Sequence, residues 1–162
     1  MDILVADLNK DISDLKSVAN GAFSSTPDSD LSDWFSFDQM IKTVFEGNGI
    51  CLKAVKNGVI VGIIYAQQES LINGKEGSEK WVIIIAAVDP KETGQGIGSM
   101  LLKELENLTS KKSVSKMFVY TNKGDEKVIN FYKKNGYQDA GWIQDYQYGK
   151  GNSAVFLIKY LN

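Results

Sequence analysis

Histidine and arginine are both absent from this chain of 162 residues, and all eighteen basic residues are lysine. Without histidine, no Ser-His or Cys-His nucleophile pair can form, and a zinc or non-haem iron site is disfavoured. Without arginine, no bidentate guanidinium clamp is available for a phosphate or a carboxylate. We therefore expect no metal site, and we expect a bound anion to be met by lysine or by backbone amides.

Cysteine is nearly absent, since Cys51 is the single example. One cysteine cannot form an intramolecular disulfide, which fits a reducing compartment. Because Cys51 lies in an apolar stretch, we interpret it as a small buried hydrophobe rather than a nucleophile. The N-terminus lacks the basic region of a signal peptide, and no apolar run reaches transmembrane length. We predict a cytoplasmic protein that does not associate with membranes.

Strong net charge is absent as well, because the formal net charge is −2. This value argues against a general nucleic-acid partner. The composition, 43% hydrophobic and 23% charged, is that of an ordinary globular protein, and the length suits one domain over residues 1–162. We see no internal repeat and no linker that would divide the chain.

The most informative segment is an apolar strand at residues 81–88 that leads through glycines 94, 96 and 98 into an amphipathic helix. The first amides of a helix have no intrahelical partner and lie at the positive end of the helix dipole. Glycine lets the backbone approach a phosphate closely. This arrangement predicts a loop that binds a phosphate group through its amides.

The spacing of the glycines narrows the choice of ligand. A dinucleotide fingerprint needs the pattern G-x-G-x-x-G, whereas position 99 is serine in this chain. A P-loop needs a lysine directly after its last glycine, and no lysine follows Gly96 or Gly98. The segment Thr93-Gly94-Gln95-Gly96-Ile97-Gly98 instead resembles the acetyl-CoA loop of the GNAT N-acetyltransferases. It departs from the family at Thr93, where arginine or glutamine is usual. Residues 130–137 resemble a second family element, F-Y-x-K-x-G-F/Y.

Apolar periodicity predicts the element order β-α-α-β-β-β-α-β-α-β-β. This is a mixed α/β sheet of six or seven strands flanked by helices, and the order is that of the GNAT fold. Asn57-Gly58 predicts a tight hairpin, Asp125 an N-cap and Gly136 a C-cap. The expected strands are 3–6, 51–55, 59–67, 81–88, 116–121, 141–148 and 153–161. The expected helices are 11–23, 34–45, one that starts after the glycine loop, and 126–135, with a polar loop over 70–80.

The resemblance implies acetyl-CoA as the cosubstrate and assigns roles to particular residues. The loop amides would hold the CoA pyrophosphate, and the end of the preceding strand would pair its backbone with the pantetheine arm. Asn122 and Asn130 would contact the CoA arm, and Lys133 would reach the 3′-phosphate or simply end a helix. The candidate cofactor-binding residues are Ala86, Ala87, Val88, Thr93, Gly94, Gln95, Gly96, Ile97, Gly98, Ser99, Asn122, Asn130 and Lys133.

Tyr132 is the catalytic candidate that the resemblance implies. The family places a tyrosine here as the general acid for the leaving thiolate, and a phenol of pKa about 10 suits a thiol of pKa about 8.5. The alternative is a half-buried helix aromatic. No acid lies within 81–88, where many members of the family have a glutamate that acts as general base. Glu79 is a weak candidate, and a water chain or an amine that arrives neutral is the alternative.

The acceptor site is expected between the two early helices and the last hairpin. Residues 24–46 are acidic, with Asp28 among them, and could attract a cationic amine such as a polyamine, an aminoglycoside or a peptide N-terminus. A solvated acidic surface is the alternative. Aromatic side chains could wall this site, or could equally be core or an oligomer contact. They are Trp34, Phe35, Trp142, Tyr146 and Tyr148.

These observations predict an N-acetyltransferase that moves the acetyl group of acetyl-CoA to a primary amine of a small molecule or peptide. The reaction would be a direct attack in a ternary complex, and the enzyme a monomer or homodimer. The missing strand carboxylate and Thr93 also permit another hypothesis. In that alternative the chain is a non-catalytic acyl-CoA-binding sensor or a partner-binding module of the same fold.

Overall fold

A computed structural model describes residues 1–26, 29–69, 75–147 and 149–161 of the chain. Within these ranges, none of the helices combines the length and the apolar character needed to span a bilayer. The predicted contributions of Asp28 and Tyr148, and residues 70–74 of the expected polar loop, lie outside the described residues.

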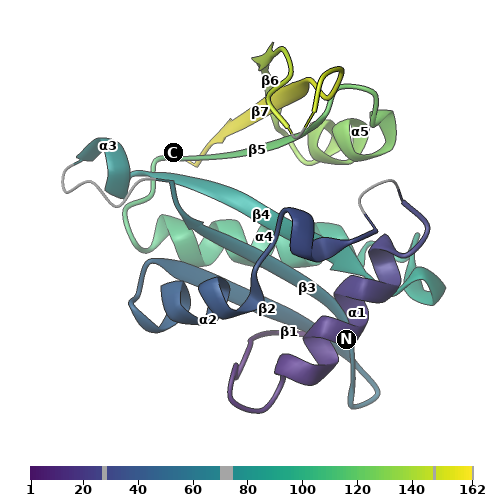
Figure 1. The fold of residues 1–162 in the computed structure, drawn as a ribbon. Helices are drawn as coiled ribbons and strands as arrows, with labels where there is room; N and C mark the ends of the chain where they lie inside the picture. The colour runs from purple at the N-terminus through teal and green to yellow at the C-terminus, as the bar shows by residue number, and fades with distance from the viewer. Residues whose placement is uncertain (27–28, 70–74, 148, 162) are drawn as a thin grey trace.

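Seven strands form one sheet of order β1-β2-β3-β4-β5-β7-β6 (Figure 1). The strands are β1 (Asp2–Val5), β2 (Gly49–Lys56), β3 (Val59–Gln68), β4 (Lys80–Val88), β5 (Lys116–Asn122), β6 (Gln138–Ile143) and β7 (Ala154–Tyr160). The helices are α1 (Ile12–Phe23), α2 (Phe37–Phe45), α3 (Lys75–Ser78), α4 (Ile97–Ser110) and α5 (Glu126–Lys134), with short 3-10 turns η1 (Leu31–Asp33) and η2 (Pro90–Glu92). Among the described residues, β4 and β5 pair in parallel and the other neighbouring strands pair antiparallel, so the predicted mixed sheet is confirmed.

The helices cover the two faces of the sheet, with α1 and α2 in front in Figure 1 and α4 behind. Successive side chains of a strand point to opposite faces, so a central strand contributes to both cores. In β3, Ile63 packs with the α1 and α2 cluster, while Ile64 packs with the α4 and α5 cluster. Both side chains are fully buried. This explains why β3 and β4 are almost continuously apolar.

Three local predictions from turn and cap residues are confirmed. Asn57 and Gly58 have φ angles of 52° and 78°, as a type I′ hairpin between β2 and β3 requires. The Asp125 carboxylate accepts a hydrogen bond from the Val128 amide at 3.2 Å and caps α5. Gly136 has a φ of 90° and its amide bonds the Lys133 carbonyl at 3.0 Å, which ends α5.

The second helix starts later than predicted. The expected range was 34–45, whereas α2 begins at Phe37. Ser36 has an extended backbone and its hydroxyl accepts a hydrogen bond from the Gln39 amide at 3.2 Å, so it is the N-cap. Trp34 follows η1 and lies outside the helix. A short helix, α3, also occupies part of the predicted 70–80 loop.

The boundaries predicted for the strand before the last were partly wrong, whereas β7 (Ala154–Tyr160) agrees with the predicted 153–161 to within one residue at each end. The expected strand 141–148 is shifted toward the N-terminus as β6, and Gln138 already pairs with Ile158 of β7. The chain leaves the strand after Ile143, and Asp145 has a left-handed φ of 52° in the following turn. Tyr146 therefore lies outside the strands, between β6 and β7.

Candidate active site

The parallel strands β4 and β5 pair only at one end and then diverge (Figure 1). Three residue pairs join them: Lys80 with Lys116, Trp81 with Met117, and Val82 with Phe118. On its other edge β4 continues to pair with β3 as far as Val88. From position 83 onward, the edge of β4 that faces β5 therefore has no strand partner among the described residues. An extended ligand can add to such an edge as one more strand.

A β-bulge at Ile84 lies where the two strands begin to diverge. Tyr65 of β3 pairs with Ile85, whereas the next residue, Ala66, pairs with Ile83, so Ile84 is the extra residue. A bulge bends a strand and redirects the side chains after it. Beyond it, Ala86 and Val88 pack on the α4 face and Ala87 on the α1 face. The three predicted pantetheine contacts thus lie on the unpaired stretch of β4.

The glycine loop ends at the N-terminus of α4. Gly94 and Gly96 both have a φ of 79°, a left-handed conformation that favours glycine, and Gly96 is the N-cap. The first helical hydrogen bond runs from the Met100 amide to the Gly96 carbonyl at 3.0 Å. The amides of Ile97, Gly98 and Ser99 precede this bond and so have no acceptor within the helix. This end of α4 can bind an anion, as predicted from the sequence.

The polar side chains of the loop are engaged with one another and with Lys56 of β2. The Lys56 ammonium lies 2.6 Å from Glu92 Oε2 and 3.1 Å from Gln95 Oε1. The side-chain amide nitrogen of Gln95 donates a hydrogen bond to the same Glu92 oxygen at 2.7 Å. Hydrogen bonds from Lys56 and Gln95 lower the pKa of Glu92. The Thr93 hydroxyl donates to the Pro90 carbonyl at 3.1 Å. Lys56 was not singled out in the sequence, yet it brings a cation to a loop that lacks arginine.

The second motif meets the first through Phe131 of α5. A Cβ added at Gly98 would lie 3.2 Å from two carbons of the Phe131 ring, so the ring packs directly against the first turn of α4. The structure therefore brings together two segments that are more than thirty residues apart in the sequence. The sequence indicates Phe131 only as a member of the motif at residues 130–137. In the sequence, the position of Phe131 next to Tyr132 was the one sign that its ring could pack against the glycine loop.

Tyr132 follows Phe131 and lies inside the α4 and α5 core. Its side chain is 3% exposed, and its ring centroid lies 5.0 Å from that of Phe131 and 5.3 Å from that of Tyr137. Burial raises the pKa of the Tyr132 phenol, so the hydroxyl keeps its proton at neutral pH. A general acid needs this protonation state, and the raised pKa also makes the phenol a weaker acid than a free tyrosine.

The other predicted cofactor contacts are spread around α5 and the end of β5. Asn122 accepts a hydrogen bond from the Gly124 amide at 2.9 Å, and Asn130 is exposed on α5. Lys133 forms an ion pair of 2.8 Å with Asp139 of β6, which directs its ammonium toward the last hairpin rather than the glycine loop. The roles of these three residues stay predictions.

Glu79, the weak candidate for a general base, lies at the closed end of the strand pair. Its carbonyl accepts hydrogen bonds from the amides of Ser115 and Lys116 at 2.9 and 3.2 Å, next to the first β4–β5 pair. The strands open at their opposite ends. Since neither β4 nor β5 contains an acidic residue, no carboxylate of these two strands can serve as the base.

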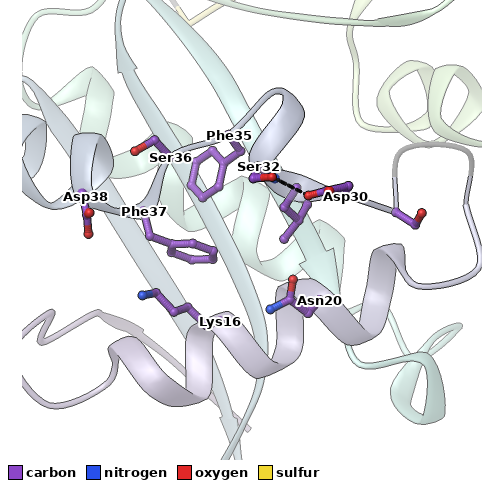
Figure 2. Close-up of a pocket in the computed structure, with 10 residues that line it drawn as sticks. Lys16, Asn20, Asp30, Ser32, Phe35, Ser36, Phe37 and Asp38 are labelled. Atoms are coloured by element: carbon purple, nitrogen blue, oxygen red, sulfur yellow. Dashed lines mark hydrogen bonds between the residues drawn. The ribbon is translucent and has the colours of Figure 1, made fainter.

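A pocket of about 570 Å³ lies between α1 and the segment that leads into α2 (Figure 2). Figure 2 shows Lys16 and Asn20 of α1 facing the segment that carries Phe35 and Phe37. Two carboxylates of the acidic segment also line the pocket, those of Asp30 and Asp38. The residues that line it are Lys16, Asn20, Ser29, Asp30, Leu31, Ser32, Phe35, Ser36, Phe37 and Asp38.

The charges of this pocket have both signs. The Asp30 carboxylate accepts hydrogen bonds from the Ser32 amide at 3.0 Å and from its hydroxyl at 2.6 Å, and these bonds lower the pKa of Asp30. The Lys16 ammonium lies 5.5 Å from the centroid of the Phe37 ring. A cationic ligand would meet two carboxylates here, and a ligand with an anionic group would meet Lys16.

Aromatic side chains gather on the β5 side of the opening. The rings of Tyr120, Tyr146 and Phe156 lie 5.1 to 5.3 Å apart, centroid to centroid. On β5, Met117 and Val119 face the α4 core, so Tyr120 points to the α1 and α2 face. Of the predicted aromatic wall, Tyr146 belongs to this group, whereas Trp142 packs against the Lys123 ammonium at 3.8 Å.

Two further observations bear on the chemistry. Cys51 is 1% exposed, and burial raises the pKa of its thiol to about 12, so it is not a nucleophile at neutral pH. Among the described residues, no group of three or more cysteine, aspartate or glutamate side chains is placed to hold a metal ion.

The glycine loop, the diverging strands and the element order together define a GNAT fold. The family model described as "Acetyltransferase (GNAT) family" matches residues 10–137. The chain therefore belongs to the GNAT acetyltransferase family, and the predicted family and enzyme class are confirmed. No curated protein matches the sequence.

Solved structures with the same fold include several acetyltransferases. An N-acetyltransferase from Staphylococcus aureus Mu50 has a TM-score of 0.82 at 17% identity, covering 99% of this chain and 98% of that one. A ribosomal-protein-alanine N-acetyltransferase from Brucella melitensis has a TM-score of 0.78 at 20% identity, covering 99% of both chains. An aminoglycoside 6′-N-acetyltransferase complexed with coenzyme A has a TM-score of 0.76 at 18% identity, covering 100% of this chain and 98% of that one. At these identities the likeness shows the fold alone.

Proposed function

We propose that the chain, as one domain over residues 1–162, transfers the acetyl group of acetyl-CoA to a primary amine. The observation that carries the proposal is the opening between β4 and β5 beside the free amides of α4. An extended thioester arm fits the unpaired edge of β4, and a pyrophosphate fits the helix N-terminus. A structural neighbour complexed with coenzyme A supports the choice of cosubstrate.

The reaction is a direct attack within a ternary complex. The amine nitrogen attacks the acetyl carbonyl, the C–S bond breaks as the amide forms, and the leaving thiolate takes the proton of the Tyr132 phenol. Unpaired amides of β4 polarise the carbonyl, and positioning supplies much of the rate. The buried Cys51 thiol offers no covalent route. In the absence of a strand carboxylate, the amine arrives neutral or first loses its extra proton through water. Its nitrogen gives up a further proton as the amide forms, and a proton from water restores the Tyr132 phenol.

The acceptor is a cationic amine of a small molecule or a peptide. Support comes from the pocket of about 570 Å³, in which Asp30 and Asp38 attract positive charge. The names of two structural neighbours point to an aminoglycoside and to a ribosomal protein as the substrates of those proteins. The cytoplasmic location and the monomer or homodimer stay predictions.

The test is release of free thiol from acetyl-CoA with a panel of amines: polyamines, aminoglycosides, amino acids and peptide N-termini. The proposal expects release with one cationic class, and expects Asp30→Asn and Asp38→Asn together to raise the KM for that amine about tenfold without changing the KM for acetyl-CoA. Asp14→Asn on the exposed side of α1 is the matched control. Tight CoA binding with no turnover across the panel would instead favour the sensor hypothesis.

A further inference from the structure

Lys159 of β7 joins three elements at the C-terminal end of α5. Its ammonium lies 2.7 Å from Glu106 Oε2 of α4 and 2.9 Å from the Asn135 carbonyl, which is the C-cap of α5. It also lies 5.7 Å from the centroid of the Tyr137 ring. A cation at a helix C-terminus meets the negative end of the helix dipole. One side chain therefore fastens α5 to α4 and to β7.

Glu106 is the more buried partner of this ion pair. The side chains of Glu106 and Lys159 are 14% and 27% exposed. Glu106 Oε1 and the Tyr137 hydroxyl are buried and lack a hydrogen-bond partner among the described residues. Burial and then the charge of Glu106 raise the pKa of Tyr137. Removal of the Lys159 charge would leave the Glu106 carboxylate buried without its cation, which is strongly unfavourable.

The contact of Lys159 with Glu106 and Asn135 is linked to Tyr132 through Tyr137. The Tyr137 amide donates to the Tyr132 carbonyl at 3.1 Å, and the two rings lie 5.3 Å apart. One residue before Tyr132, Phe131 packs against Gly98 at the start of α4. The last turn of α5 is thus held at both ends, by Phe131 on Gly98 and by Lys159 on the C-cap. A shift at the second contact moves the Tyr132 hydroxyl relative to α4.

We propose that Lys159 is a positioning residue for acetyl transfer, which fixes the Tyr132 phenol by fastening the C-terminal end of α5 to Glu106. The proposal rests on the proposed function, because it concerns the acid of that reaction. Lys159 does not touch the reacting atoms. Its effect is on the distance from the phenol to the thiolate, to which proton transfer is sensitive.

The experiment compares Lys159→Met and Lys159→Arg with a control on the same surface. Lys103 of α4 lines the same pocket as Glu106, Asn135 and Lys159, but its side chain is exposed, so Lys103→Met is the matched control. Steady-state kinetics measure kcat and the KM for acetyl-CoA. Hydrogen exchange of the amides of residues 131–137 measures the order of the α5 end, independently of activity.

The proposal expects Lys159→Met to lower kcat about tenfold while the KM for acetyl-CoA changes by less than about twofold. Exchange should accelerate over 131–137 and stay unchanged in β1 to β3. Lys159→Arg should recover most of kcat. The double variant Lys159→Met/Glu106→Gln should regain thermal stability, since no unpaired buried carboxylate remains, and should still have low kcat.

Three results would overturn the proposal: wild-type kcat in Lys159→Met, faster exchange throughout the chain, or kcat that returns together with stability in the double variant. The last two would show a role in stability alone. If wild-type protein turns over no amine, the proposed function fails instead. The exchange rates of 131–137 then decide by themselves whether Lys159 holds the end of α5.

Discussion

The two parts of the sheet differ in how completely they are covered. In β1 to β4, the central strands have helices on both faces, and Ile63 and Ile64 are fully buried. In β5 to β7, all six positions of the edge strand β6 are exposed, and a group of tyrosines lies open on one face. Within the sheet, three residue pairs of β4 and β5 join the two parts.

This difference shows how the fold can hold two substrates between its parts. The well-packed part supplies a fixed edge on β4 and the free amides of α4. The less covered part supplies Tyr132 from α5. Outside the sheet the parts meet at Phe131 on Gly98, at the start of α4, and at Lys159 on Glu106, near the paired end of β4 and β5. The account places cosubstrate binding mainly in the first part and proton transfer in the second.

The largest expected effect is a loss of stability, which should be greater in the well-covered part of the sheet than in the other. Ile64→Ala, at a fully buried site of β3, should lower the free energy of unfolding by about 2–5 kcal/mol, because it leaves a cavity under α4. Phe156→Ala, at a half-buried site of β7, should cost about 1–2 kcal/mol. Urea denaturation measures both. Equal losses would contradict the difference in coverage.

The next effect distinguishes the glycine loop, which is proposed to bind acetyl-CoA, from another glycine turn in the first part. Gly96→Ala and Gly47→Ala each place a side chain at a φ near 80° with no described atom within 4 Å of the new Cβ, so both should lose about 1–2 kcal/mol of stability. Only Gly96→Ala should weaken acetyl-CoA binding, by about tenfold, because it displaces the α4 amides. Calorimetric titration checks this, and equal affinities in the two variants would refute it.

The smallest effect concerns the contact between the two parts at α4 and α5. Gly98→Ala puts a methyl group 3.2 Å from the Phe131 ring and should lower kcat/KM about threefold as the ring moves aside. Adding Phe131→Leu makes room for the methyl group and should restore part of the loss. If the two substitutions simply add, the contact does not couple the parts.

Much of the fold followed from the sequence because local signals agreed with the tertiary structure. Asn57-Gly58, Asp125 and Gly136 marked a hairpin and two helix ends, and each has the conformation that its residue type predicts. The last hairpin was placed less well. An alternation of apolar and polar residues around Trp142 looks the same in a strand and in a turn, and pairing with β7 decides the register.

The site was less predictable, since its defining features arise between distant segments. A near-continuous apolar strand gives no sign of where its pairing with β5 stops, so the opening beyond Val82 could not be located. Contacts such as Lys56 with Glu92 and Lys159 with Glu106 join exposed-looking charges that are 36 and 53 residues apart. Charged residues of this kind are usually solvated, so the sequence offered no reason to select them.

The central claim is that a phenol from the less covered part completes a cosubstrate site built by the other. The most direct measurement is kcat and the acetyl-CoA dissociation constant of Tyr132→Phe beside Tyr160→Phe, a matched change at a tyrosine that is 65% exposed. The account predicts that Tyr132→Phe lowers kcat about 100-fold or more while its dissociation constant stays within about twofold, and that Tyr160→Phe changes neither. Wild-type kcat in Tyr132→Phe would contradict the claim.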